Sequence, residues 1–278
     1  MEIKNRMVFR VETAPNLFAY LKQNKISFEE ENGIVVCEIY ESDCHWKSIS
    51  KILTQDKVFR TFETEFSKEE LKNAEWLYMR SQWRFGYPQP EDDFGYKNIT
   101  YTRNNCCDAC GCGLIQKKPF LIKKTPNWGR RCIGELDWVS DAMFVNERAK
   151  SVFEMEKISG ISFWEVMNKT GSEPLWGIYQ LKIETELENG LISEGRRVRE
   201  RVRCEDCGTI KNLTNGAGVF KFQKQIFDNK PDIVLSGDWF GADKYATKII
   251  LVKQRVYQML VEHKLDKSLV FEPINLET

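Results

Sequence analysis

Histidine is scarce in this chain, and the usual catalytic motifs are missing. Among 278 residues there are only two histidines, His45 and His263. No nucleophile elbow, phosphate-binding loop or histidine-rich metal motif is present. Histidine is the side chain that most often performs acid–base catalysis at neutral pH. We therefore expect a protein that acts by binding and is not an enzyme.

Neither sign of charge dominates, and long apolar runs are absent. The 41 lysines and arginines equal the 41 aspartates and glutamates, so no overall field attracts the protein to nucleic acid or an anionic membrane. No segment approaches the ~20 apolar residues that a spanning helix needs. The first residues also lack the apolar core of a signal peptide. These absences predict a cytoplasmic protein that does not associate with membranes.

Cysteine, in contrast, is plentiful. The chain has nine cysteines, which in a reducing cytosol are more typical of metal or redox chemistry than of disulfides. Two matched segments contain four of them, CDACG at 107–111 and CEDCG at 204–208. This spacing lets two thiolates curl around one ion, and glycine readily adopts the positive φ of such a turn. We call each segment a knuckle.

Two knuckles supply the four thiolates of a closed, tetrahedral structural zinc site with no open position for substrate. The predicted ligands are Cys107, Cys110, Cys204 and Cys207. Two other readings of the pairs are a thioredoxin-like redox site and plain buried thiols. Cys106 and Cys112 are close enough in sequence to replace an upstream ligand. The isolated cysteines are expected to be small buried hydrophobic residues: Cys37, Cys44 and Cys132.

The first 66 residues predict a ferredoxin-like plait. Strand-like and helix-like segments follow one another in the order βαββαβ, with a hairpin turn at Asn32-Gly33 and Pro15 near the start of the first helix. A further helix is predicted over residues 67–81, opened by a capping box of Ser67 and Glu70. The aromatic, proline-containing stretch 82–96 then predicts a boundary near residue 90. The expected domains are residues 1–90 and 91–278.

The second domain contains an internal similarity. Segment 144–166 aligns without a gap on segment 251–274, so that Val145 matches Val252 and Arg148 matches Arg255. Each copy follows a knuckle and reads as a strand, an amphipathic helix and a second strand. We therefore expect an α+β protein whose second domain consists of two related knuckle–strand–helix–strand halves clasped by one zinc ion.

An arginine-rich segment precedes the second knuckle. In "RRVRERVRC", residues 196–204, strand alternation places four arginines on one face: Arg197, Arg199, Arg201 and Arg203. Such a face could bind phosphates or an acidic protein surface. It could equally be the solvated outer face of a sheet. The segment keeps open a second function, that of a zinc-ribbon nucleic-acid-binding or regulatory protein that uses this arginine-rich strand.

The paired Cys-x-x-Cys-Gly motifs and the closing segment 238–276 resemble the bacterial double-CXXCG-motif family. Several proteins of that family are encoded as immunity partners beside polymorphic toxins. The resemblance covers residues ~104–278 and implies that the cysteines are metal ligands. It also implies that this protein binds and neutralises a cognate toxin without catalysis.

Overall fold

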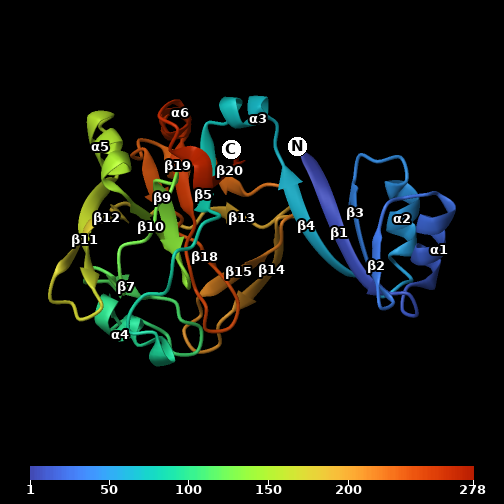
Figure 1. The fold of residues 1–278 in the computed structure, drawn as a ribbon, viewed down its shortest axis with the longest axis horizontal. Helices are drawn as coiled ribbons and strands as arrows, with labels where there is room; N and C mark the ends of the chain where they lie inside the picture. Colours follow the sequence, from blue (N-terminus) through green and yellow to red (C-terminus); the bar gives the residue numbers. More distant parts are fainter. The chain divides into compact units, whose positions relative to one another are not determined.

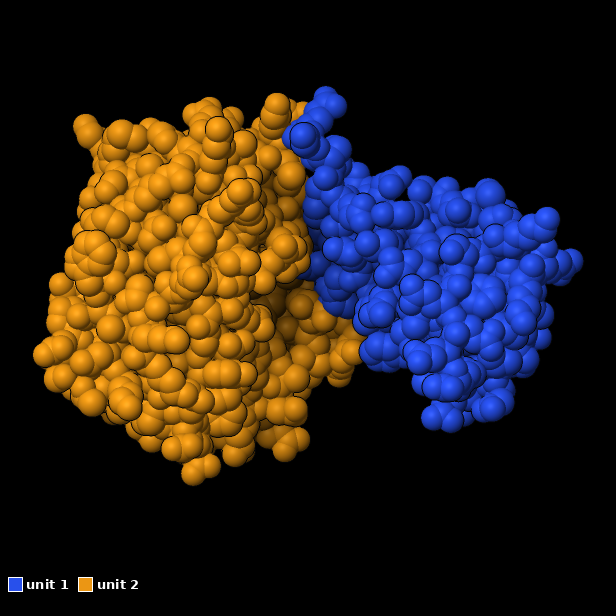
Figure 2. Space-filling view, in the orientation of Figure 1, with its two compact units in different colours: residues 1–70, 195–197, 215–219 blue, residues 71–194, 198–214, 220–278 orange.

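The computed structural model describes residues 1–278 and divides them into two compact units. The first unit comprises residues 1–70 together with the short returning segments 195–197 and 215–219 (Figure 2). The second comprises residues 71–194, 198–214 and 220–278. The fold is mixed α+β with several separate sheets. None of the helices combines the length and the apolar sequence that crossing a bilayer would require.

The first unit is built on a four-stranded sheet. Its strands are β1 (Glu2–Arg10), β2 (Glu29–Glu31), β3 (Ile34–Tyr40) and β4 (Phe59–Glu65). They lie in the order β2-β3-β1-β4, and every neighbouring pair is antiparallel. Helices α1 (Pro15–Gln23) and α2 (Trp46–Ile52) cover one face of the sheet (Figure 1). The sequence predicted this βαββαβ order of elements correctly.

Local residue chemistry explains these elements. Pro15 is the first residue of α1, where its missing N–H costs no hydrogen bond. Asn32 and Gly33 join β2 to β3 with φ values of 50° and 75°, as a two-residue hairpin turn requires. Alternate residues of β1 point into a core that also includes Leu17, Leu21 and Cys37. Cys37 is thus a buried hydrophobic residue, as expected.

The predicted helix over residues 67–81 is only half right. Helix α3 (Lys68–Asn73) begins with the expected capping box: the Glu70 amide donates to Ser67 Oγ at 3.2 Å, and the Ser67 amide donates to Glu70 Oε2 at 2.8 Å. The chain then forms strand β5 (Trp76–Ser81). Trp76 and Leu77 are buried because strands flank β5 on both edges, and this tertiary pairing overrides the local helical pattern.

Strand β5 belongs to the second unit. It lies between β19 (Ile250–Lys253) and β20 (Leu269–Pro273) in a sheet of order β17-β19-β5-β20, in which β17 is Ile233–Leu235. The compact units therefore divide after Glu70, earlier than the boundary expected near residue 90. Trp83 also packs on Trp128, with ring centroids 5.3 Å apart, so the start of the aromatic stretch belongs to this unit.

The second unit contains four more sheets. The largest is antiparallel apart from β8 and has the order β8-β11-β12-β10-β9. Its strands are β8 (Leu121–Ile122), β9 (Ile133–Leu136), β10 (Val139–Val145), β11 (Ile161–Asn168) and β12 (Pro174–Ile183). The three smaller sheets are β6 (Tyr101–Thr102) with β7 (Ile115–Gln116); β14 (Val198–Arg203), β15 (Ile210–Thr214) and β18 (Trp239–Phe240); and β13 (Leu191–Ile192), β16 (Lys221–Gln223) and β21 (Asn275–Glu277).

Two helices of the second unit follow directly on strands. They are α5 (Glu147–Met155), between β10 and β11, and α6 (Gln254–Glu262), between β19 and β20. Both lie at the same end of this unit in Figure 1. The remaining helices are short: α4 (Tyr96–Thr100) and the 3-10 turns η1 (Asp92–Phe94), η2 (Lys224–Phe227) and η3 (Asp266–Ser268). Both similar segments thus form the expected strand, helix and strand.

Helices α5 and α6 also end in the same way. Lys157 and Lys264, matched in the sequence alignment, each follow the C-cap with positive φ, 50° and 57°. The next residue then donates its amide back to the helix, Ile158 to the Phe153 carbonyl at 3.1 Å and Leu265 to that of Leu260 at 2.8 Å. This hydrogen bond is the mark of a Schellman C-terminus. The two aligned segments therefore share their backbone conformation at the helix C-terminus.

The two helices bind each other reciprocally. Arg148 of α5 donates to the carbonyl of His263, the C-cap of α6, at 2.7 Å. Its aligned counterpart Arg255 of α6 donates to the carbonyl of Glu156, the C-cap of α5, at 2.9 Å. The side chains of Glu156 and His263 meet at 3.3 Å. Each arginine contacts the C-cap of the other helix, so the two contacts are equivalent under exchange of the helices, which is the pattern of a two-fold interface.

Candidate metal centre

Each knuckle is the tip of an antiparallel hairpin. Strands β6 and β7 flank the first knuckle, and β14 and β15 flank the second. In the first, the Cys107 amide donates to the Cys112 carbonyl at 2.9 Å; in the second, the Cys204 amide donates to the Thr209 carbonyl at 2.9 Å. These bonds close equivalent loops, because each joins two residues that are five positions apart in the sequence.

The glycine of each knuckle completes the turn. The Gly111 amide donates to the Cys107 carbonyl at 2.8 Å, and the Gly208 amide donates to the Cys204 carbonyl at 2.9 Å. Both glycines have positive φ, 76° and 72°. A Cβ at Gly111 would lie 2.3 Å from the carbonyl oxygen of Lys244, so this position also lacks room for a side chain. Both glycines therefore have the positive φ that the sequence predicted for this turn.

The four expected cysteines come together in the second unit. The Sγ atoms of Cys107, Cys110, Cys204 and Cys207 all lie within 4.8 Å of one another, and this group could hold a metal ion. The Sγ atoms of Cys107 and Cys204 are 3.8 Å apart, and those of Cys110 and Cys207 are 3.6 Å apart. A tetrahedral site with metal–sulfur bonds of about 2.3 Å has edges of about 3.8 Å, whereas a disulfide measures about 2.05 Å. The donor set and its spacing fit a four-thiolate metal site.

The neighbouring cysteines stand outside this set. Cys112 is buried, and its carbonyl closes the first knuckle by accepting the Cys107 amide. Burial raises the pKa of the Cys112 thiol. Cys106 instead directs its thiol to the Cys107 carbonyl at 3.7 Å. Of the isolated cysteines, Cys132 is buried as expected, but Cys44 is exposed, and the expectation for Cys44 was wrong.

Two residues outside the ligand set, Thr209 and Lys211, affect the electrostatics of the four thiols. Hydrogen bonds from the hydroxyl and amide of Thr209 lower the pKa of Cys207 to about 6, while burial raises the pKa of Cys110 to about 12. A bound divalent cation favours the thiolate form of all four sulfurs. Lys211 of β15 is buried, and its ammonium donates to the carbonyls of Cys110, at 3.0 Å, and of Asp243 and Tyr245.

Lys211 is informative because all three acceptors are uncharged carbonyls. A buried ammonium is costly unless a negative charge lies near it. Four thiolates around one divalent cation carry two net negative charges, and Lys211 touches the backbone of one of the four cysteines. Four neutral thiols would offer no such counter-charge. The sequence analysis did not single out Lys211, and nothing in the short segment that follows the second knuckle marks this lysine as buried.

The arginine-rich segment is less regular than its sequence suggests. A bulge between Val198 and Glu200 interrupts the pairing of β14 with β15, so strict alternation does not extend along the segment. Arg197 is buried and belongs to the first unit. Arg199, Arg201 and Arg203 are exposed on β14. The four arginines therefore do not form the single exposed face that was expected.

Arg203 has a structural contact of its own. Its guanidinium donates to the carbonyl of Gly208 at 3.2 Å and so braces the second knuckle. Arg199 approaches only its neighbour Glu200, at 4.0 Å, with both side chains more than half exposed. An exposed pair of this kind contributes about 0–1 kcal/mol. Arg199 and Arg201 are thus the arginines most available to a partner.

A second, smaller group of metal-binding side chains lies in the first unit. Asp43, Cys44 and His45 offer ligand atoms within 4.8 Å of one another. The three residues are consecutive and mostly exposed, and the Nδ1 atom of His45 is engaged with the Tyr20 hydroxyl at 3.2 Å. The four-cysteine set, in contrast, joins segments that are far apart in sequence. It is the stronger candidate because its geometry is specific.

No protein-family model matches this chain, and no curated protein matches it either.

Proposed function

We propose that the protein is a non-enzymatic binding protein with one structural zinc ion. The ligands are Cys107, Cys110, Cys204 and Cys207. The observation that carries this is the four-thiolate cage, whose edges of 3.8 and 3.6 Å suit tetrahedral coordination. A zinc ion bound by four thiolates has no free position at which to activate water. Its role is then to hold the two knuckles together.

We further propose that the second unit consists of two duplicated halves clasped by the metal. Equivalent cysteines of the two knuckles face each other in the cage. The reciprocal bonds of Arg148 and Arg255 supply a second clasp between equivalent helices. For the first unit we propose a ferredoxin-like plait, supported by the antiparallel order β2-β3-β1-β4. That fold hosts many functions and names none.

The partner that we propose is a cognate bacterial toxin, which this protein binds and neutralises as an immunity protein. Support comes from the resemblance of the two Cys-x-x-Cys-Gly segments to the double-CXXCG-motif family. A binder with a permanently assembled scaffold suits this role, because pre-organised surfaces lose less entropy on association. We propose a cytoplasmic location for it.

Co-expression tests this function. The product of the adjacent gene should inhibit growth when expressed alone, and this protein should restore growth and co-elute with it in gel filtration. Replacing Arg199 and Arg201 with alanine tests the arginine strand as the interface. A double variant of Lys117 and Lys118, which are also exposed, removes the same charge elsewhere and serves as the control. Loss of complex in the arginine variant alone would locate the interface.

A nucleic-acid-binding function is the second candidate, and the exposed arginines beside the second knuckle favour it. The two functions differ in their response to salt. Binding to phosphates releases counterions and weakens steeply as salt rises, whereas a mixed protein interface depends on salt less. Tight binding to DNA or RNA at physiological salt, lost in the arginine variant and at higher salt, would replace the immunity proposal.

A further inference from the structure

A cavity of about 460 Å³ lies within the second unit beside the first knuckle. Asn105 and Gly113, on the loop that carries Cys107 and Cys110, line one side. Trp239 of β18 lines another, and β18 pairs with β15, the strand that follows the second knuckle. Small-molecule sites typically measure about 300–1,000 Å³. The cavity therefore has the size of a ligand site and depends on elements that both knuckles position.

Two of the charged groups that line the cavity neutralise each other. The Lys248 ammonium forms an ion pair with Glu186 and also lies 4.5 Å from the ring centroid of Trp239. Lys248 is buried, so this pair is fixed in the wall. Its charges are satisfied without a ligand.

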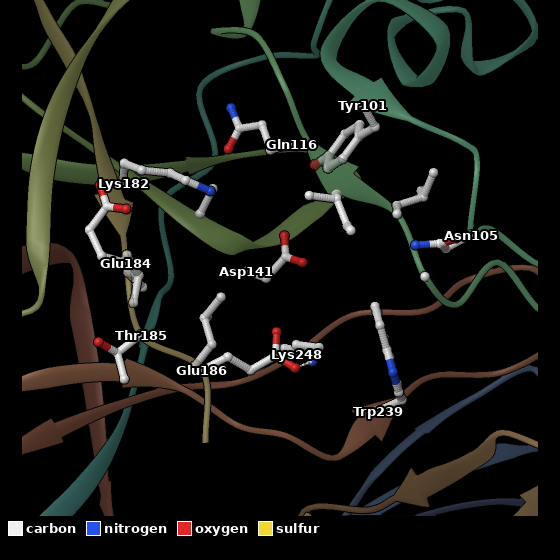
Figure 3. Close-up of a pocket in the computed structure, with 16 residues that line it drawn as sticks. Tyr101, Asn105, Gln116, Asp141, Lys182, Glu184, Thr185, Glu186, Trp239 and Lys248 are labelled. Atoms are coloured by element: carbon white, nitrogen blue, oxygen red, sulfur yellow. Dashed lines mark ion pairs between the residues drawn. The ribbon is translucent and has the colours of Figure 1, made fainter. Parts of the chain in front are cut away.

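Three other charged groups line the cavity: Asp141, Lys182, and Glu184, whose carboxylate accepts from the Ser162 hydroxyl. Asp141 of β10 and Lys182 of β12 form no direct ion pair, although their charges attract each other at longer range; the Lys182 ammonium also lies 5.4 Å from the centroid of the Trp164 ring. Figure 3 shows the Asp141 carboxylate near the middle of the cavity, with the Lys182 ammonium and the Tyr101 hydroxyl directed toward the same space. Burial raises the pKa of Asp141, and backbone hydrogen bonds and the charges of Lys182 and Lys248 only partly oppose this rise.

We propose that this cavity binds a neutral α-amino acid in its zwitterionic form. The ligand's ammonium pairs with Asp141, and its carboxylate pairs with Lys182 and accepts from the Tyr101 hydroxyl. A purely anionic ligand would face Asp141, and a purely cationic one would face Lys182. A zwitterion satisfies both groups at once, because desolvated charges bind well only when each is paired.

The remaining wall is mixed, with polar residues (Asn105, Gln116, Glu184 and Thr185) and an apolar part that suits an apolar side chain. Ile115 of β7 lines the cavity although its side chain is 54% exposed, and Ala142, Leu235 and Trp239 line it as well. Covering such surface with a leucine-sized side chain is favourable by about 25 cal/mol per Å². This inference stands apart from the immunity proposal, since it concerns a cavity in the second unit and not the arginine strand.

Calorimetric titration of the zinc-loaded full chain with L-leucine tests the proposal. The matched probes are 3-methylbutylamine, which lacks the carboxylate, and 4-methylpentanoate, which lacks the ammonium. L-leucine should bind saturably, and each fragment should bind at least about tenfold more weakly, because each leaves one protein charge unpaired. Absence of saturable binding by L-leucine, L-methionine and L-phenylalanine up to about 10 mM would overturn the proposal. Equal binding of either fragment would overturn it too.

Two variants test which charged group of the ligand pairs with Asp141 and which pairs with Lys182. Asp141→Asn should weaken L-leucine about tenfold and strengthen 4-methylpentanoate, because it removes the carboxylate that this fragment faces, and Lys182→Gln should weaken L-leucine and strengthen 3-methylbutylamine for the corresponding reason. Asp228→Asn and Lys169→Gln change exposed residues outside the cavity and should bind as the wild type does. Variants that retain zinc and melting temperature yet bind L-leucine normally would contradict the assignment. If a variant does not fold, L-leucine should still raise the melting temperature of the wild type, and each fragment at the same concentration should raise it less.

Discussion

Arg148 and Arg255 link helices α5 and α6 reciprocally. The guanidinium of Arg148, on α5, donates to the C-cap carbonyl of α6, and that of Arg255, on α6, donates to the C-cap carbonyl of α5. A cation at a helix C-terminus satisfies a free carbonyl and interacts favourably with the helix dipole. The two arginines differ in one respect. Arg255 also pairs with Asp232 at 3.0 Å, and the Asp232 side chain is only 5% exposed. Substitution of the two arginines should therefore lower the free energy of unfolding by unequal amounts.

We predict that Arg148→Met lowers the free energy of unfolding by about 1 kcal/mol, the typical net value of one hydrogen bond, because this contact is exposed. Arg255→Met should cost more, about 2–3 kcal/mol, because it leaves the buried Asp232 carboxylate without its guanidinium. Urea denaturation measures both, with Arg130→Met, an exposed arginine of the same unit, as the control. Equal losses for the two variants would show that Asp232 does not depend on Arg255.

The two knuckle glycines should also respond differently to alanine. Both have positive φ, so each substitution carries backbone strain of about 1 kcal/mol. At Gly111 the new Cβ also meets the Lys244 carbonyl oxygen, whereas at Gly208 the nearest atom is the Arg203 guanidinium at 3.6 Å. Gly111→Ala should therefore release zinc more readily to a chelator than Gly208→Ala. The reverse order would mean that the first knuckle is not as close to Lys244 as described.

Lys211→Met tests the counter-charge to the thiolates. Groups that support metal ligands commonly change affinity about 10–100-fold when removed, and we expect a loss of zinc affinity in that range. Competition with a chromogenic chelator measures it. Lys244→Met is the matched control, because Lys244 is exposed beside the same knuckle. Unchanged affinity in Lys211→Met would show that the ammonium does not sense the cluster.

Glu135 should make stability depend on pH. Burial raises the pKa of this carboxyl from its usual value of 4.5 to about 7. The unfolded chain then loses its proton at lower pH than the folded one, so the free energy of unfolding should fall as pH rises from about 4.5 to 7 and level off above. The fall is at most about 3 kcal/mol, at 1.36 kcal/mol per pKa unit.

Glu135→Gln should remove most of this decline. Its side-chain oxygen can still accept the Ser81 amide, which donates to Glu135 Oε1 at 2.6 Å in the wild type. The measurement is the difference in unfolding free energy between variant and wild type from pH 5 to 8, which cancels the titration of groups common to both. A difference that does not change with pH would contradict the raised pKa.

Local sequence predicted the parts of this fold that local chemistry determines. The hairpin at Asn32-Gly33 and the capping box of Ser67 and Glu70 needed only neighbouring residues to be recognised. The knuckles are similar, since Cys-x-x-Cys-Gly specifies its own turn. The four cysteines therefore assembled as expected, although the sequence could not show that the metal-binding set omits Cys106 and Cys112.

Other features depend on distant partners. Residues 76–81 read as a helix, but β19 and β20 make them the interior of a sheet. The bulge at Val198 depends on pairing with β15, and no pattern within the arginine segment reveals it. Lys211 became recognisable only once three carbonyls from Cys110, Asp243 and Tyr245 surrounded its ammonium. Burial of a polar group is a property of the whole fold, so single-sequence reasoning misses it.

The most direct test of this account is the metal content of the native, untagged chain purified without chelators. We predict one zinc ion per chain. Cys107→Ser, Cys110→Ser, Cys204→Ser and Cys207→Ser should each lose zinc and destabilise the second unit, because zinc binding is coupled to folding. Cys106→Ser and Cys112→Ser should keep their zinc. Much less than one equivalent in the wild type, or full zinc content in Cys110→Ser, would contradict the proposed site.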